Sequence, residues 1–125
     1  MINDSAQSPA LLRNSTLAHL AASITRPRYD RSRMFPGLVH IGVGGFNRSH
    51  LAVYLDDLLL RGESKPWSEF GIGLLPPDKL IHSALVEQDF LYGLLLVDSE
   101  QESYRIIGSL AGHLYAPEST ETVLE

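Results

Sequence analysis

Residues 38–48, Leu-Val-His-Ile-Gly-Val-Gly-Gly-Phe-Asn-Arg, decide the fold of this chain. The stretch Leu38–Ile41 is short, apolar and rich in β-forming residues, which is typical of a buried parallel strand. Glycines follow at once, and beyond them apolar side chains recur at helical spacing as far as Leu60. We therefore expect a strand, a glycine turn and a helix over Leu38–Leu60.

The glycine turn has the chemistry needed to receive an anionic ligand. Gly42 is placed for the tight turn, and Gly44 removes a side chain where a pyrophosphate would approach the backbone. The first turn of the helix offers unpaired N–H groups and a partial positive charge to that anion. Asn47 stands where the common fingerprint has a third glycine, so a turn that merely needs glycine remains the alternative. The strand–turn–helix context favours dinucleotide binding.

Two polar residues near the turn have open roles. Arg48 lies in the first helical turn, where a cation opposes the helix dipole, so we expect it to pair with a phosphate or to form a surface salt bridge. His50 can face the ligand or pack against the protein, and packing is the simpler interpretation.

An acid after the second strand is the other candidate for the site. We expect a strand over Phe70–Leu75, and Asp78 follows it at the position where dinucleotide folds hydrogen-bond the adenosine ribose. Asp78 can instead serve only as the first acid of its own helix. If it binds ribose, its charge repels a 2′-phosphate and favours NAD over NADP, although the adjacent Lys79 weakens that preference.

The rest of the chain completes a partial doubly wound arrangement. A second helix is expected from Pro77 or Asp78 to Val86, since proline is favoured at the start of a helix. Two β-rich stretches, 91–97 and 104–109, flank an acidic loop and predict a hairpin. Another helix begins within 117–125. The predicted fold class is α/β, a partial Rossmann-type dinucleotide-binding domain with a β-hairpin insertion, truncated before its later strands.

The first 36 residues are expected to form a separate lead, so that the chain divides into 1–36 and 37–125. Residues 1–14 are interpreted as a polar lead. Residues 14–16 offer N-cap chemistry for a short helix whose apolar face carries Leu17, Leu20 and Ile24. Arginines then gather over 26–33, and we interpret this cluster as a solvated linker because no aromatic stacking series accompanies it.

Composition excludes several classes of function. The chain has 125 residues, 44% of them hydrophobic, and a net charge of -5, which indicates one globular domain and argues against nucleic acid or an anionic membrane as the main partner. It has no cysteine, which excludes disulfides and thiolate sites and fits a cytoplasmic location. No signal peptide, membrane span or metal-ligand spacing is present. No convincing acid–base catalyst is present either.

Five collinear blocks resemble the mannitol dehydrogenase family of polyol-specific long-chain dehydrogenases. The family's GxGxF turn, followed by a small residue, arginine, another small residue and histidine, is similar to residues 40–50. Further similarity follows in residues 54–59, 71–75, 88–92 and 105–109, and the lead-in 27–31 also fits. The resemblance covers residues 12–125. Asn47 departs from the histidine found in many members.

The resemblance implies hydride transfer between NAD, or NADP, and a sugar alcohol or ketose, without a metal. It assigns the cofactor turn and the ribose-binding acid to positions that match the family. The predicted cofactor-binding residues are Ile41, Gly42, Val43, Gly44, Gly45, Phe46, Asn47, Arg48 and Asp78. No catalytic residue carries over, because the family's catalytic lysine, asparagine and histidine belong to a downstream part, and members are several times longer.

Two function hypotheses follow. The first is the cofactor-binding part of a polyol dehydrogenase, in which polyol or ketose binds only to the full-length protein. The second is a catalytically inactive nucleotide-binding or interaction fragment. A methyltransferase that uses adenosylmethionine also has a glycine turn and an acid, but the collinear blocks disfavour it. We also expect an exposed sheet edge, because a doubly wound sheet needs its later strands and helices.

Overall fold

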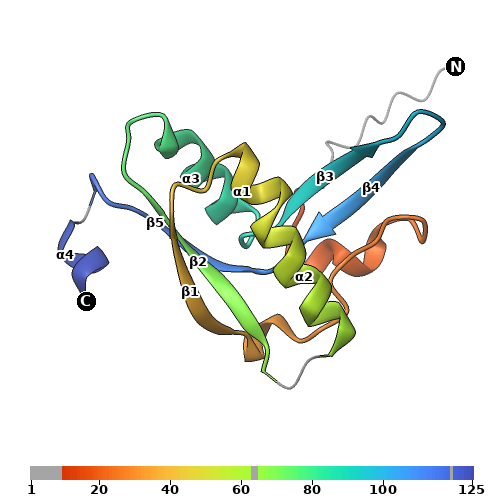
Figure 1. Ribbon diagram of the computed structural model, residues 1–125, viewed down its shortest axis with the longest axis horizontal. Coiled ribbons are helices and arrows are strands. Elements are labelled where there is room, and N and C mark those ends of the chain that lie inside the picture. The colour runs from red at the N-terminus through yellow and green to blue at the C-terminus, as the bar shows by residue number, and fades with distance from the viewer. Residues whose placement is uncertain (1–9, 63–64, 119) are drawn as a thin grey trace, which may run out of the picture.

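Three parallel strands form the sheet that positions the glycine turn. The computed structural model describes residues 10–62, 65–118 and 120–125. Strands β1 (Phe35–Ile41), β2 (Trp67–Gly73) and β5 (Leu110–Tyr115) pair in the order β1-β2-β5, all parallel (Figure 1). Ile41 pairs with Ile72, which pairs in turn with Leu114, so the carboxyl ends of the strands meet at one edge.

The third parallel strand, β5, corrects the prediction, which ended the β-rich sequence at residue 109. Gly108 and Ser109 separate the hairpin from β5. Gly112 and His113 interrupt the apolar pattern of the strand, and both are buried. The apolar pattern therefore does not reveal β5, because its polar residue His113 packs inside the protein. Strand β2 also begins and ends earlier than predicted.

Helices connect the parallel strands as the sequence predicts, with one break. The predicted single helix after the glycine turn is divided into α1 (Gly45–Ser49) and α2 (Leu51–Arg61), because His50 has φ -127° and ψ -84°. Gly62 ends α2 in the left-handed conformation, with φ 74°. Helix α3 (Asp78–Glu87) begins where the proline pair predicts.

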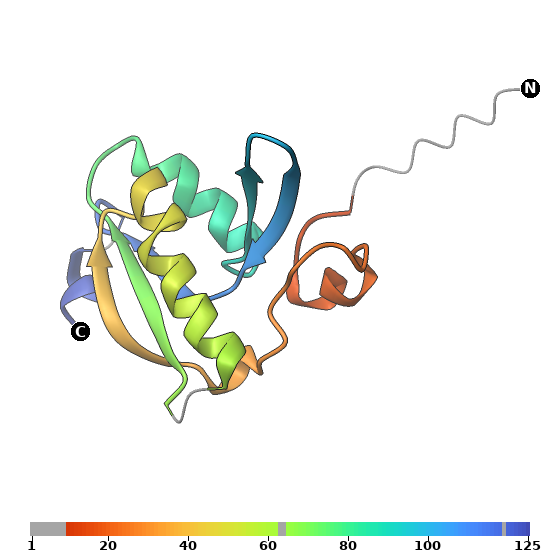
Figure 2. The same cartoon turned by 45° about the vertical axis from the view of Figure 1, so that its right-hand side comes forward.

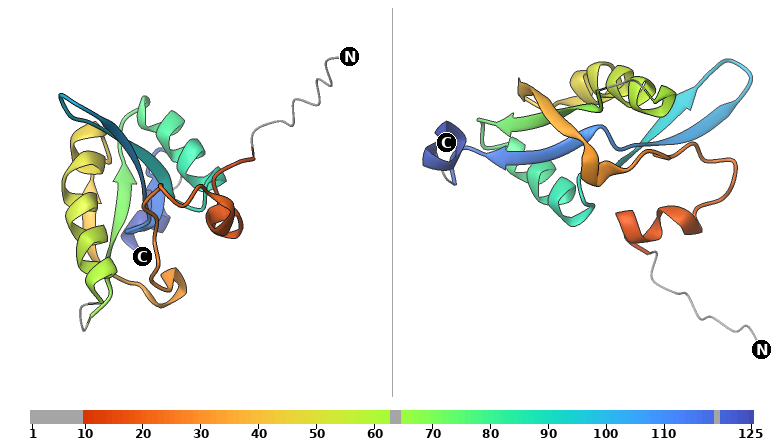
Figure 3. Two further views of the ribbon diagram at one scale, coloured as in Figure 1. Left: turned by 90° about the vertical axis from the view of Figure 1, so that its right-hand side faces the viewer. Right: turned by 90° about the horizontal axis from the view of Figure 1, so that it is seen from below.

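The predicted hairpin is confirmed. Strands β3 (Tyr92–Val97) and β4 (Glu102–Ile107) pair antiparallel, and the acidic loop joins them. Figures 1 and 3 show the hairpin projecting from the body at the end remote from the short helix α4 (Thr120–Leu124). The core joins the hairpin to both connecting helices and to β5. Its buried residues are Val43, Ala52, Leu85, Tyr92, Ile107 and Leu110.

The N-terminal segment is more closely attached than predicted. Residues 14–19 form a short 3₁₀ helix rather than an α-helix, and none of its residues is buried. Arg31, predicted in a solvated linker, is half-buried and donates to the carbonyls of Gly108 and Leu110. The interpretation of a solvated linker is therefore wrong for Arg31. Figure 2 shows this segment beside the β3–β4 hairpin and running to the carboxyl end of α2 before β1 begins.

Some predictions concern residues that the structure does not describe or a division of the chain that it does not decide. Residues 1–9 of the expected polar lead and residues 63–64 of the expected loop lie outside the described residues. The division of the chain after residue 36 remains a prediction. Within the described ranges, every helix is too short or too polar to cross a membrane.

Candidate functional site

The sheet brings the two predicted parts of the site to the same edge. The glycine turn follows Ile41 at the end of β1, and the turn that leads to Asp78 follows Gly73 at the end of β2. The Gly42 N–H donates to the carbonyl of Ile72 at 2.8 Å, which fixes the start of the glycine turn beside β2. Ligands of open parallel sheets bind in the crevice beyond such carboxyl ends.

Gly42 is required by the backbone of the turn. Its φ is +88°, in the left-handed region that residues with a side chain rarely adopt. The residue therefore makes the tight turn possible, as the sequence predicts. This requirement belongs to the fold and by itself indicates no ligand.

Gly44 and Gly45 differ from Gly42 because the protein itself does not require glycine at either position. Gly44 caps α1 with φ -82° and ψ -175°, an extended conformation open to any residue. A Cβ atom on Gly44 or Gly45 would come within 4 Å of no atom beyond its chain neighbours and the backbone of its own helix. The backbone here is bare on its open side, as close approach of a pyrophosphate would require.

Phe46 and His50 line the exposed side of α1. The Phe46 ring is 77% exposed and stacks on the His50 ring at 4.1 Å, with 16° between their planes. His50 Nδ1 also lies 3.0 Å from the Phe46 carbonyl oxygen and 2.9 Å from Ser49 Oγ. His50 thus packs on its own helical segment, and the pair presents a flat surface beside the turn.

Arg48 closes the glycine turn through its own loop. Its Nη1 donates to the carbonyl of Val43 at 2.9 Å, and Val43 is buried in the core. The Tyr92 hydroxyl donates to the Arg48 carbonyl at 2.6 Å. Burial raises the pKa of Tyr92, so this hydroxyl stays a donor. Arg48 therefore holds the turn in shape, and a contact with phosphate remains a prediction.

Asn47 points into the protein and not toward the open side of the turn. The residue is 5% exposed, and its Nδ2 donates to Oε1 of Glu69 in β2 at 2.9 Å. Glu69 is fully buried. Burial raises the pKa of its carboxyl group, while the Asn47 hydrogen bond and His40 act in the opposite direction. A role of Asn47 in cofactor binding would thus come from its backbone.

Asp78 is held by the turn that precedes it. Its Oδ2 accepts from the N–H groups of Leu74 and Leu75, both at 2.9 Å. Lys79 pairs with Glu118 at 3.2 Å and leaves Asp78 without a lysine partner. The local role of Asp78 is clear, and its contact with a ribose remains a prediction.

A pair of histidines at this edge was missed by the sequence analysis. Nδ1 of His113 in β5 lies 2.9 Å from Nδ1 of His82 in α3. His113 is 3% exposed, and burial together with His82 lowers its pKa to about 4. Its ring lies against β2, where a Cβ on Gly71 or Gly73 would come within 2.7 or 3.2 Å of it. Gly71 and Gly73 in β2 are the sequence signal that could have indicated a ring packed against this strand.

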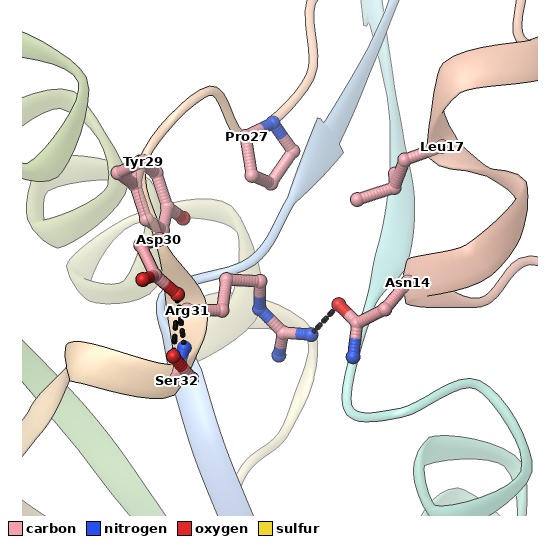
Figure 4. A pocket seen from close by; sticks show the side chains of 7 residues that line it. All are labelled: Asn14, Leu17, Pro27, Tyr29, Asp30, Arg31 and Ser32. Atoms are coloured by element: carbon pink, nitrogen blue, oxygen red, sulfur yellow. Dashed lines mark hydrogen bonds between the residues drawn. The ribbon is translucent and has the colours of Figure 1, made fainter.

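Two cavities lie away from this site, at the amino end of β5. They have volumes of about 360 and 390 Å³, and both are lined by Asn14, Arg31 and Ser32. Figure 4 shows the Arg31 guanidinium reaching Asn14, to which it donates at 2.5 Å. The remaining Arg31 donors bond Gly108 and Leu110, so the guanidinium fastens the N-terminal segment to the body.

No group of three or more histidine, aspartate or glutamate side chains in the described part of the chain could hold a metal ion. The arrangement at the carboxyl edge suits binding of an anion by backbone N–H groups.

Comparison with known proteins tests the resemblance to the mannitol dehydrogenase family. No family model matches the chain. Two curated relatives are both named mannitol 2-dehydrogenase. The protein from Phaeosphaeria nodorum is 42% identical over 93% of this chain and 21% of its own length. The protein from Cereibacter sphaeroides is 41% identical over 85% of this chain and 22% of its own. The chain thus spans less than a quarter of the length of these relatives.

Solved structures give the same result for the fold. Pseudomonas fluorescens mannitol 2-dehydrogenase, in a ternary complex with NAD and D-mannitol, superposes with a TM-score of 0.86 at 36% identity. A D-sorbitol dehydrogenase in substrate-free form superposes with a TM-score of 0.79 at 34% identity. Each match covers 92% of this chain and 24% of the solved chain. The resemblance to mannitol dehydrogenases and the α/β fold class are confirmed.

Proposed function

We propose that this chain is the cofactor-binding portion of an NAD-dependent oxidoreductase that interconverts a mannitol-like sugar alcohol and a ketose. The observation that carries the proposal is the bare backbone at Gly44 and Gly45. The fold requires glycine at Gly42 but at neither of these positions, so the requirement lies with a ligand that approaches closely. Relatives named for mannitol oxidation support the substrate class.

The residues of the turn fit a dinucleotide in complementary ways. Gly42 shapes the turn, Gly44 and Gly45 would leave room for the pyrophosphate, and the N–H groups at the start of α1 would be available to its oxygens. Arg48 keeps the loop closed and lies close enough to the turn to add positive charge. These residues would hold NAD, which would supply the acceptor for a hydride from the alcohol carbon and, when reduced, the donor of a hydride to the ketose carbonyl.

Asp78 determines the preference among nicotinamide cofactors in this proposal. Its Oδ2 is occupied by two backbone N–H groups, which leaves Oδ1 for a ribose hydroxyl. A fixed negative charge at that position repels the 2′-phosphate of NADP, and Lys79 is engaged by Glu118. We therefore propose NAD as the cofactor, with weaker binding of NADP.

The edge strand supports the view that this chain is part of a larger unit. Among the described residues, β1 pairs with a strand on one side only, and its apolar side chains are open to solvent, with Phe35 58%, Val39 66% and Ile41 62% exposed. Such a surface is costly in isolation and prone to association. We propose that further polypeptide covers this edge in the active enzyme, which acts in the cytoplasm on polyol and ketose.

The alternative of a fragment that binds nucleotide without catalysis has one observation in its favour. Lys65 precedes β2 at the opposite edge of the sheet, and Lys79 pairs with Glu118. Neither lysine is thus placed to act as a general base at the glycine turn. In the first proposal, the groups that move the proton come from outside this chain.

Calorimetric titration of NAD into the chain and its Gly44→Val variant tests the proposed function. A Cβ at Gly44 would lie in open space, so the variant should keep its circular dichroism spectrum while NAD affinity falls at least about tenfold, or ~1.4 kcal/mol. The matched control is Gly93→Val in the hairpin, which should bind NAD like the wild type. Equal NAD binding by the wild type and Gly44→Val would contradict the proposal.

A second titration with NADP tests the role of Asp78. The Asp78→Asn variant keeps an oxygen for the Leu74 and Leu75 N–H groups but loses the charge. NADP should bind more tightly to this variant than to the wild type, while NAD should bind less tightly. An unchanged ratio of the two affinities would remove Asp78 from the ribose site.

A further inference from the structure

A buried hydrogen bond joins the glycine turn to the middle strand of the sheet. Nδ2 of Asn47 in α1 donates to Oε1 of Glu69 in β2 at 2.9 Å. Glu69 is 0% exposed and Asn47 is 5% exposed. Asn47 occupies the position of the third glycine in the common fingerprint, where glycine lets the helix pack closely on the strand. Here a directional hydrogen bond replaces that close packing.

The fold alone gives little reason to place an acid at this position. Among the described residues, Oε2 of Glu69, Oδ1 of Asn47 and Nδ1 of His40 are buried without a hydrogen-bond partner. The nearest basic group, Nδ1 of His40, is 4.0 Å from Oε1. A buried carboxyl group with so few partners is costly, and an apolar residue of similar volume would pack at lower cost.

The break at His50 explains why α1 needs its own attachment. α1 has five residues and is separated from α2 by the non-helical backbone of His50, so the two are not one continuous helix. Within the described ranges, Asn47 supplies the one side-chain hydrogen bond from α1 into the three-stranded sheet. The contacts of Arg48 run instead to Val43, in the loop, and to Tyr92, in the hairpin.

We propose that Glu69 is a positioning residue for the cofactor, acting through Asn47 to fix the direction in which α1 presents its N–H groups to the pyrophosphate. This inference rests on the proposed function. Glu69 itself touches no ligand, because it is fully buried beneath the turn. Its contribution is confined to the pyrophosphate, since the adenosine end of the ligand lies toward the β2–α3 turn. A ligand without a pyrophosphate should not depend on Glu69.

The test compares two probes, NAD and adenosine, on the folded chain. Adenosine lacks the pyrophosphate, and its weak binding is followed by NMR titration. Glu69→Leu removes the acceptor at similar volume, whereas Glu69→Gln keeps an oxygen for Asn47. We expect Glu69→Leu to weaken NAD binding at least tenfold and adenosine binding less than twofold. Glu69→Gln should restore NAD binding to within threefold of the wild type.

Two further variants keep the test decisive. Asn47→Ala removes the donor of the same hydrogen bond with a smaller change in the core. It should weaken NAD binding and spare adenosine binding, as expected for Glu69→Leu, and it can be measured even if Glu69→Leu does not fold. Ser109→Ala removes a buried bond to the carbonyl of Ala52 in α2, and as the matched control it should leave the ratio of NAD to adenosine affinity unchanged.

Distinct results would overturn the inference. Equal weakening of NAD and adenosine by Asn47→Ala would indicate a merely structural bond, and unchanged NAD affinity would show that the bond has no role. Loss of NAD binding in Glu69→Gln equal to that of Glu69→Leu would also overturn it. A wild-type chain that binds adenosine but not NAD would overturn the proposed function, and the inference with it.

Discussion

Among the described residues, the carboxyl groups of Asp56 in α2 and Glu69 in β2 are both fully buried, and their surroundings are opposite. Asp56 accepts from Nη2 of Arg105 at 2.6 Å, from the Gly108 N–H at 3.0 Å and from the Tyr29 hydroxyl. Glu69 accepts from one neutral amide, that of Asn47. One carboxyl group is matched by a full positive charge, and the other is not.

The difference follows from where each group lies. Asp56 joins three segments that are distant in sequence, namely the N-terminal segment through Tyr29, the hairpin through Arg105, and α2 itself. This cluster lies away from the carboxyl edge of the sheet, and its task is to hold the fold together. Glu69 lies beneath the glycine turn. A buried carboxyl group that has a charged partner is costly to neutralise because the partner is left unpaired, whereas one that lacks a charged partner calls for a functional reason.

Replacing each carboxylate by the corresponding amide, in Asp56→Asn and Glu69→Gln, tests this contrast. Asp56→Asn should have the largest effect on the free energy of unfolding. Neutralising Asp56 leaves Arg105, whose side chain is 14% exposed, with the partly exposed Asp57 as its counter-charge. Complete loss of a buried pair costs about 3–5 kcal/mol of the free energy of unfolding, and we expect the loss to lie at the lower end of that range. Urea denaturation of the chain measures the change.

Asp57→Asn is the matched control for this prediction. Oδ1 of Asp57 lies 2.7 Å from the same Arg105 nitrogen, but the Asp57 side chain is 39% exposed. Exposed ion pairs contribute about 0–1 kcal/mol. Similar losses of stability in the two variants would show that burial does not distinguish Asp56, and the contrast with Glu69 would lose its basis.

Local patterns explain what could be predicted of the fold. The apolar stretch before Gly42, the leucine spacing of α2 and the acidic loop of the hairpin are each confined to a short run of sequence, and all three elements are present. The third parallel strand was missed because Gly112 and His113 break its apolar pattern. Its identity depends on pairing with β2, about 40 residues earlier in the chain, which periodicity does not report.

The residues of the candidate site likewise divide into those that the sequence predicts and those that it does not. The glycines of the turn are visible in sequence because backbone geometry at one position determines them. Glu69 and His113 could not be assigned from the sequence, since the partner of Glu69 is 22 residues away and that of His113 is 31 residues away. Both lie inside strands, where a single polar residue normally indicates an exposed face.

Acid should reveal a second incompletely satisfied group at the carboxyl edge, His113. Its pKa is about 4 in the folded chain, because burial and the neighbouring His82 disfavour the charged ring, whereas Asp78 favours it. The unfolded chain therefore takes up the proton first, near pH 6.5. The stabilisation is present in full above that pH and is lost as the pH falls toward 4, by about 3 kcal/mol at most.

Urea denaturation between pH 7 and pH 4, on the wild type and on His113→Gln, isolates this contribution. The raised pKa of Glu69 acts with the opposite sign, because its protonation in acid favours the folded state. The difference between the two proteins cancels that contribution. We expect the stability of the wild type to fall more steeply than that of His113→Gln. Parallel pH profiles would show that His113 titrates normally in the folded chain.

The smallest change in the free energy of unfolding is expected for Glu69→Gln, the counterpart of Asp56→Asn. Glu69→Gln keeps the shape of the side chain and an acceptor for Asn47, and it removes a charge that has no full counter-charge. The free energy of unfolding at pH 7 should therefore change by less than about 1 kcal/mol, or increase, in contrast to Asp56→Asn. Burial alone would make the two substitutions equally costly. Urea denaturation of both variants under one condition decides whether the partner or the burial of a carboxyl group determines its contribution. A loss of several kcal/mol in Glu69→Gln would show that Glu69 stabilises the fold as an ionised group, and the functional reason for its burial would fall away.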